Sequence, residues 1–176
     1  MAHALKQIDV AVSEQIVDFR WGPLTSVMLL ISAWWVKDVV FFAGALAFDI
    51  RHRRWPWRSL AVGFATAIGA LVANVLKPIS DRPRPFAQHL WTGLGPHPHS
   101  SSMPSGHAAT AAAAGVALAM LVPALRIPAV ALALLVCLSR VYLGVHFAGD
   151  VLVGAVLGGG IATLIVWTFR RTVDPA

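Results

Sequence analysis

Long apolar runs, each close to 20 residues, are the strongest constraint on how this chain of 176 residues can fold. A helix needs about 20 mostly apolar residues to cross the hydrocarbon core of a bilayer, where every backbone polar group must be satisfied within the segment. Four segments meet or approach that length: Ser59–Leu76, Ser105–Leu125, Ile127–Val145 and Val151–Phe169. Charged residues make up only 12% of the chain, against about 25% in soluble domains. The sequence therefore predicts an all-α, integral-membrane helical bundle.

The segment Gly22–Ile50 is apolar at both ends but carries Trp34, Trp35, Lys37 and Asp38 in its middle. One interpretation is a short surface or re-entrant helix to about residue 35, followed by a membrane span. Paired tryptophans beside charges are typical of the membrane interface, which favours this interpretation. The other interpretation is a hairpin of two short spans. We expect five transmembrane helices, with six as the alternative.

The first 21 residues interleave apolar side chains such as Ile8 and Val12 with acidic ones such as Asp9 and Glu14. This pattern is typical of an amphipathic helix that lies in the membrane interface. We therefore expect a single domain over residues 1–176. It divides into an interfacial helix (1–21), a transmembrane core (22–170) and a cytoplasmic tail (171–176).

The arginines outside the polar motifs orient the bundle. Seven of them fall on one side when the spans are placed in order: Arg51, Arg53, Arg54, Arg58, Arg126, Arg170 and Arg171. The positive-inside rule makes that side cytoplasmic. We expect a multi-pass protein of the plasma membrane that contacts membrane lipids. A homo-oligomer is possible, and the sequence does not decide its oligomeric state. The net charge of +6 does not indicate a nucleic-acid partner, because the cations occur in short clusters between apolar runs.

Three polar motifs stand at the opposite, extracytoplasmic ends of the spans. They are Lys77-x6-Arg84-Pro85, Pro104-Ser105-Gly106-His107 and Ser139-Arg140-x5-His146-x3-Asp150. The order of the spans brings all three motifs to one face of the bundle. Together they supply cations, backbone N–H donors and two histidines, and these are the groups that phosphoryl transfer requires.

Lys77 and Arg84 could place two cations around one anion, since the planar guanidinium matches phosphate oxygens well. The alternative is that both side chains merely reach into the lipid headgroups. Between them, Asp81 and Arg82 are interpreted as a surface ion pair of little energetic weight.

Ser105 precedes an alanine-rich helix and is a natural N-cap, which is a structural role in most proteins. A helix N-terminus with free backbone N–H groups is also a ready site for phosphate. Gly106 lets the backbone approach such a group closely, and His107 lies in the first turn beside the same space. Capping alone and phosphate binding both remain open for this motif.

His146 and Asp150 are four residues apart, so on a helix they would share a face. A carboxylate that accepts one imidazole N–H fixes the tautomer and leaves the other nitrogen free to attack. Arg140 lies at a similar membrane level, and Gly144 allows a bend between it and His146. A purely structural His–Asp pair is the alternative. Two histidines permit a division of labour between a nucleophile and a general acid.

These motifs resemble those of the phosphatidic acid phosphatase type 2 (PAP2) superfamily, which also includes bacterial non-specific acid phosphatases and vanadium haloperoxidases. Its signatures K-x6-RP, PSGH and SR-x5-H-x3-D all occur here in order, and the resemblance covers about residues 22–170. It implies that His146 attacks phosphorus, that Asp150 holds the His146 ring and that His107 protonates the leaving oxygen. It further implies that the phosphate oxygens are held by Lys77, Arg84, Ser105, Gly106 and Arg140, with no metal and no cofactor.

The expected function is therefore metal-independent dephosphorylation of a membrane lipid phosphate or diphosphate through a phosphohistidine. Family substrates include undecaprenyl diphosphate and other polyprenyl phosphates, phosphatidylglycerophosphate and phosphatidic acid. Two alternatives belong to other classes: a haloperoxidase-like protein, which predicts a soluble chain, and a phosphate-binding transporter, which has no obvious use for a nucleophile and an acid.

Overall fold

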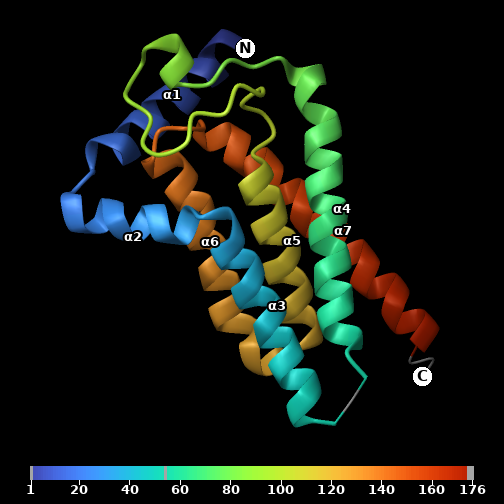
Figure 1. The fold of residues 1–176 in the computed structure, drawn as a ribbon. Helices are drawn as coiled ribbons and strands as arrows, with labels where there is room; N and C mark the ends of the chain where they lie inside the picture. Colours follow the sequence, from blue (N-terminus) through green and yellow to red (C-terminus); the bar gives the residue numbers. More distant parts are fainter. Residues whose placement is uncertain (1, 54, 174–176) are drawn as a thin grey trace.

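A computed structural model describes residues 2–53 and 55–173, and within them the chain forms seven α-helices and two 3-10 turns (Figure 1). The longest connection between helices is the loop over residues 81–105. The helices are α1 (Ala2–Asp18), α2 (Gly22–Ser32), α3 (Trp34–Arg51), α4 (Trp57–Ser80), α5 (Gly106–Leu121), α6 (Arg126–Tyr142) and α7 (Ala148–Val173). The 3-10 turns are η1 (Phe86–Gln88) and η2 (Pro123–Leu125). The prediction of an all-α bundle is confirmed.

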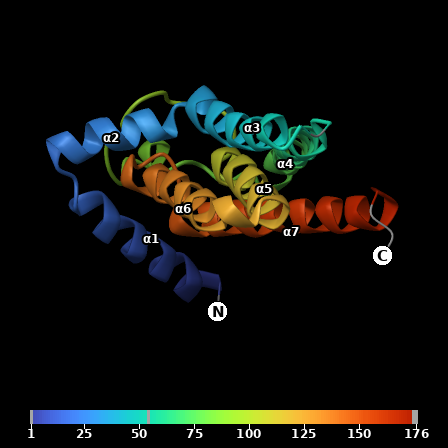
Figure 2. The same ribbon diagram turned by 90° about the horizontal axis from the view of Figure 1, so that it is seen from below.

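Helix α5 is the centre of the bundle, with α3, α4, α6 and α7 packed around it. Ten of its 16 residues are alanine or glycine, and most of these are buried. Small residues let helix backbones approach closely, which is how helices associate where no water is available to drive them together. Figure 2 shows α1 and α2 outside this bundle, on the side of α6.

Among the described residues, three helices are long and apolar enough to cross a bilayer: Trp57–Ser80, Pro123–Tyr142 and Ala148–Arg170. They correspond to three of the predicted spans. The span predicted at Ser105–Leu125 is shorter in the structure, because α5 ends at Leu121. Pro123 forces the preceding Val122 into an extended conformation, with φ at −130° and ψ at 86°, and so stops the helix.

The polar middle of Gly22–Ile50 is the site of a break, as the re-entrant interpretation predicts. Helices α2 and α3 meet at Ala33 with a bend of 62°, and together they pass the same test of length and hydropathy as one broken span. Figure 1 shows α2 lying across the bundle while α3 runs along it. The break directs Ser32 and Lys37 into the protein, where both are buried.

The two ends of the bundle differ in chemistry. The loop between α4 and α5, the α6–α7 turn and helix α1 gather at one end, and the α3–α4 connection lies at the other (Figure 1). At the α3–α4 end, buried Asp49 accepts a hydrogen bond from Arg58 at 3.1 Å. The three polar motifs therefore share the end that lies away from this arginine-rich connection.

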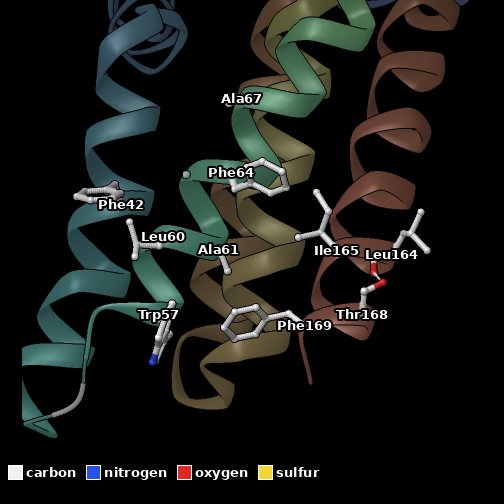
Figure 3. Close-up of a pocket in the computed structure, with 11 residues that line it drawn as sticks. Phe42, Trp57, Leu60, Ala61, Phe64, Ala67, Leu164, Ile165, Thr168 and Phe169 are labelled. Carbon is white, nitrogen blue, oxygen red and sulfur yellow. Dashed lines mark hydrogen bonds between the residues drawn. The ribbon is translucent and has the colours of Figure 1, made fainter. Parts of the chain in front are cut away.

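An apolar groove of about 860 Å³ opens near the α3–α4 end, between α4 and α7 (Figure 3). Aromatic side chains form much of its lining, including Phe42, Phe64 and Phe169. None of its lining residues is ionisable. A groove of this composition suits hydrocarbon, and it lies at the end of the bundle away from the three polar motifs.

The contact between α5 and α7 depends on glycines, which gives a test of the fold. A Cβ added at Gly158 would overlap the carbonyl oxygen of Ala109, whereas a Cβ added at Gly160 would meet no atom within 4 Å. We expect Gly158→Ala to lower the free energy of unfolding by about 1–3 kcal/mol, as overpacking usually does. Gly160→Ala is the matched control, and it should leave stability nearly unchanged. Thermal unfolding midpoints in detergent measure both, and equal midpoints would show that the helices are not in close contact.

Candidate active site

The turn between α6 and α7 carries His146. Gly144 adopts a φ of +71°, a conformation that suits glycine, and it reverses the chain between the two helices. Helix α7 begins only at Ala148, so His146 precedes the helix. The expectation that His146 and Asp150 share a helix face is therefore wrong. The two side chains meet across the turn, because the glycine bend folds His146 back onto the first residues of α7.

The carboxylate of Asp150 is fully buried and tightly held. Its Oδ2 accepts hydrogen bonds from the Ser102 hydroxyl at 2.5 Å and from the Phe147 backbone N–H at 2.9 Å. The Nδ1 of His146 lies 3.7 Å from the same oxygen and 3.4 Å from the Ser102 hydroxyl. A proton on Nδ1 therefore faces acceptors, and this arrangement leaves the lone pair of the imidazole on Nε2.

Arg84 approaches His146 from the other side of the ring. Its Nη1 lies 3.1 Å from His146 Nε2 and donates to the carbonyl of Val145 at 3.0 Å. Its Nε donates to the carbonyl of Ser100 at 2.8 Å. Arg84 is 4% exposed, and its guanidinium has no carboxylate partner among the described residues. A buried cation held only by neutral acceptors is available to bind an anion.

The start of α5 contributes the second motif. Ser105 is the N-cap of α5, and its hydroxyl accepts a hydrogen bond from the Ala108 N–H at 3.5 Å, so the capping prediction is confirmed. Its own N–H donates to the backbone carbonyl of Asp150 at 3.0 Å, which joins the starts of α5 and α7. Gly106 opens the helix, and His107 follows within the first turn.

The remaining cations converge on the same space. The ammonium group of Lys77, in the last turn of α4, lies 3.7 Å from the position of a Cβ at Gly106. Arg140, in the last turn of α6, is buried and contacts the Ser32 hydroxyl. Its Nε is buried without a hydrogen-bond partner among the described residues. His107 lies within electrostatic reach of Lys77, Arg140 and His146. The structure thus brings all eight predicted site residues together.

Three polar residues near the site were not assigned to it by sequence reasoning. Ser102 lies between Asp150 and His146, and only its place in a serine-rich loop hinted at it. Lys37 is buried near His107 and pairs with Asp38 at 2.7 Å, although its position beside two tryptophans suggested the membrane interface. Arg82 was misassigned. It forms ion pairs with Asp150 and Asp9, and the expected surface pair with Asp81 is wrong because Arg82 turns inward.

The ionisation of His146 follows from its surroundings. The ring lies in the turn between two membrane helices and is 2% exposed. Burial lowers the pKa of His146 to about 4, and the positive charges of Arg84 and Arg140 act in the same direction. The hydrogen bond and charge of Asp150 oppose this shift. His146 is therefore neutral near pH 7, with its Nε2 lone pair available.

The fold and the site define a class: a helical membrane protein in which a carboxylate-held histidine and a second histidine lie among cationic side chains. Residues 58–174 match the family model of the PAP2 superfamily. The chain belongs to the PAP2 superfamily, as a membrane phosphatase of that family.

Relatives and solved structures agree with this assignment. A lipid A 1-phosphatase of Rhizobium etli is 30% identical over 155 residues, covering 80% of this chain and 67% of the relative. A decaprenylphosphoryl-5-phosphoribose phosphatase of Mycolicibacterium smegmatis is 38% identical over 127 residues, covering 70% of this chain and 63% of the relative. The crystal structure of a transmembrane PAP2-type phosphatidylglycerolphosphate phosphatase from Bacillus subtilis superposes with a TM-score of 0.77 at 31% identity, covering 98% of this chain and 89% of that one.

The lowered pKa of His146 has a measurable consequence for stability. The unfolded chain binds more protons than the folded protein between pH 6.5 and about 4, so the free energy of unfolding falls as the pH drops through that window. The shift corresponds to about 3 kcal/mol. We expect His146→Gln to remove this part of the pH dependence of the thermal midpoint, and His99→Gln, at an exposed histidine, to keep it. Midpoints of wild type and His146→Gln that run parallel from pH 7 to pH 4 would contradict the lowered pKa.

Proposed function

We propose that this protein removes phosphate from a membrane lipid phosphate or diphosphate, with the Nε2 of His146 as the nucleophile. The observation that carries the proposal is the orientation of His146. Its Nδ1 faces Asp150 and Ser102, and its Nε2 faces Arg84 at 3.1 Å. A phosphate bound by Arg84 would lie against the Nε2 lone pair, which is the geometry that attack on phosphorus requires.

In the first step, the Nε2 lone pair forms a bond to phosphorus and the bond from phosphorus to the lipid oxygen breaks. The product is a phosphohistidine at His146, whose ring carries a positive charge that Asp150 stabilises. His107 carries a proton once the negatively charged phosphate is bound, and it gives this proton to the leaving oxygen. In the second step, His107 takes a proton from water, and the resulting hydroxide attacks phosphorus. The bond between phosphorus and Nε2 of His146 breaks, its electron pair returns to Nε2, and phosphate leaves.

The phosphate oxygens are held by the cations and the helix start that surround His146. Lys77, Arg84 and Arg140 supply charge, and Ser105 and Gly106 place the first backbone N–H groups of α5 beside it. Phosphoryl transfer needs mainly such positioning and charge stabilisation. The unpartnered Nε of buried Arg140 supports this role, since an anion would satisfy it.

Two observations favour a lipid substrate. The relatives carry names of enzymes that act on lipid A, on a decaprenylphosphoryl sugar phosphate and on phosphatidylglycerolphosphate. The site also lies at the ends of the membrane helices α4, α6 and α7. Isoprenoid diphosphates, phosphatidylglycerophosphate and phosphatidic acid are the candidate substrates. The arginines at the opposite end favour a plasma-membrane protein with an extracytoplasmic site.

The first experiment measures phosphate release by the purified protein from a panel of these lipids, with EDTA present. We expect release from at least one lipid, and we expect His146→Ala to lower kcat by about a thousandfold or more, as loss of a nucleophile does. His99→Ala, at an exposed histidine, is the control and should retain activity.

The intermediate is tested with lipid labelled at the phosphorus. The wild-type protein, quenched during turnover, should carry an acid-labile label on a peptide containing His146, and His146→Ala should carry none. Full activity in His146→Ala would overturn the nucleophile assignment. Binding of phosphate without turnover of any lipid would instead indicate the phosphate-binding transporter.

The role of Arg140 gives a separate prediction. Hydrogen bonds to a charged group contribute about 1.5–3 kcal/mol, so Arg140→Gln should weaken competitive inhibition by inorganic phosphate by about 10- to 100-fold. Arg126→Gln, at the opposite end of the same helix, removes the same charge away from the site and should leave the inhibition constant unchanged. Equal inhibition constants for the two variants would remove Arg140 from the phosphate site.

A further inference from the structure

Helix α1 lies against the start of α7 and contributes two polar side chains to it. The carboxylate of Asp9 accepts a hydrogen bond from the Gly149 N–H at 2.7 Å, and the hydroxyl of Ser13 accepts one from the Ala148 N–H at 2.9 Å. These N–H groups belong to the first turn of α7, where no partner exists within the helix. A Cβ at Gly149 would lie 2.9 Å from the Asp9 carboxylate, so the glycine allows this approach.

Arg82 connects α1 with the carboxylate of Asp150. Its Nη2 lies 2.6 Å from Asp9 Oδ2, and its Nη1 lies 2.7 Å from Asp150 Oδ1. The guanidinium also lies over the ring of Phe147, with its carbon 4.1 Å from the ring centroid. Three partners on three sides leave the Arg82 side chain little freedom to move. Its backbone is fixed as well, because its carbonyl accepts the Ser102 N–H at 2.8 Å.

The two oxygens of Asp150 are therefore held from opposite directions. Arg82 holds Oδ1, and Ser102 and the Phe147 N–H hold Oδ2, which faces the His146 ring. Rotation of the carboxylate would move Oδ2 away from Nδ1 of His146. Asp9 holds Nη2 of Arg82, and it therefore limits rotation of the Arg82 guanidinium and of the Asp150 carboxylate bound to it. Asp9 lies outside the region that matches the family model, which begins at residue 58.

The outer face of α1 is apolar and suits a position in the membrane interface. Leu5, Ile8 and Val12 are exposed along one face of the helix, at the spacing of successive turns. Together with Leu152 and Val153 they line an apolar hollow of about 650 Å³ beside Arg82. One face of α1 thus suits the apolar membrane interface, and the other holds the ion pairs near the site.

We propose that Asp9 is a positioning residue for the reaction, acting through Arg82 on the orientation of Asp150 and His146. This inference rests on the proposed function, in which Asp150 holds the His146 ring. Helix α1 then completes the active site by holding its supporting carboxylate, without contacting the substrate.

The experiment compares Asp9→Asn with Glu14→Gln in the full chain, reconstituted in lipid vesicles with the lipid phosphate that wild type hydrolyses. Each variant neutralises one acidic side chain of α1, but Glu14 is exposed and outside the network. Asparagine keeps an oxygen for the Gly149 N–H, so Asp9→Asn removes the ion pair and retains the helix contact. Misplacement of reacting groups by about 1 Å costs about 100-fold in rate. We expect kcat to fall by about 10- to 100-fold in Asp9→Asn with KM nearly unchanged, and Glu14→Gln to match wild type.

A double-variant comparison separates positioning from a purely structural role. If Asp9 acts through Arg82, Asp9→Asn should have no further effect on kcat in an Arg82→Gln background. Losses that multiply in the double variant, or a wild-type kcat in Asp9→Asn, would overturn the proposal. If Asp9→Asn does not yield folded protein, the test uses Arg82→Gln instead. Its control is Arg51→Gln, at an exposed arginine of the opposite end. An unchanged kcat in Arg82→Gln would overturn the proposal.

The reference variant in the same vesicles is His146→Ala. If it is inactive while Asp9→Asn is fully active, the proposed nucleophile stands and only the positioning role fails. If it retains activity, the proposed function itself fails.

Discussion

The close contact between the first turns of α5 and α7 is the constraint on which the rest of the site depends. The Ser105 N–H donates to the Asp150 carbonyl at 3.0 Å, and a Cβ at Gly154 would lie only 2.5 Å from the Ser105 carbonyl oxygen. Any larger residue at this crossing would separate the two helices. Because they touch here, the helix start that carries His107 and the turn that carries His146 face one another.

Charge is distributed unevenly around this contact. Asp150 is the carboxylate at the centre of the site, and its charge is already balanced by Arg82 at 2.7 Å. Lys77, Arg84 and Arg140 have no ion pair among the described residues, and two of the three are buried. Buried cations are unfavourable unless an anion compensates them. The pocket is thus suited to a group with several negative oxygens, and the low dielectric strengthens its attraction for that group.

Much of this architecture follows from local patterns in the sequence. The apolar runs predicted the membrane helices, and the polar middle of Gly22–Ile50 predicted the break that the structure places at Ala33. The three motifs predicted which side chains would meet. Local patterns failed at two points. The bend that Gly144 allows takes His146 off the helix that carries Asp150, so the two do not share a helix face, and Pro123 ends α5 earlier than predicted.

The sequence by itself determined that the chain is a helical membrane protein, and it predicted the eight residues that the structure brings together. Both conclusions depend on residue type and on spacing within short segments, and these are properties of the linear chain. Only the tertiary structure decided the partners of Arg82, which pairs with Asp9 at 73 residues' separation and with Asp150 at 68. It likewise decided that Ser102 lies between Asp150 and His146. A hydrogen bond between distant segments depends on how helices pack around α5, and no local pattern encodes that packing.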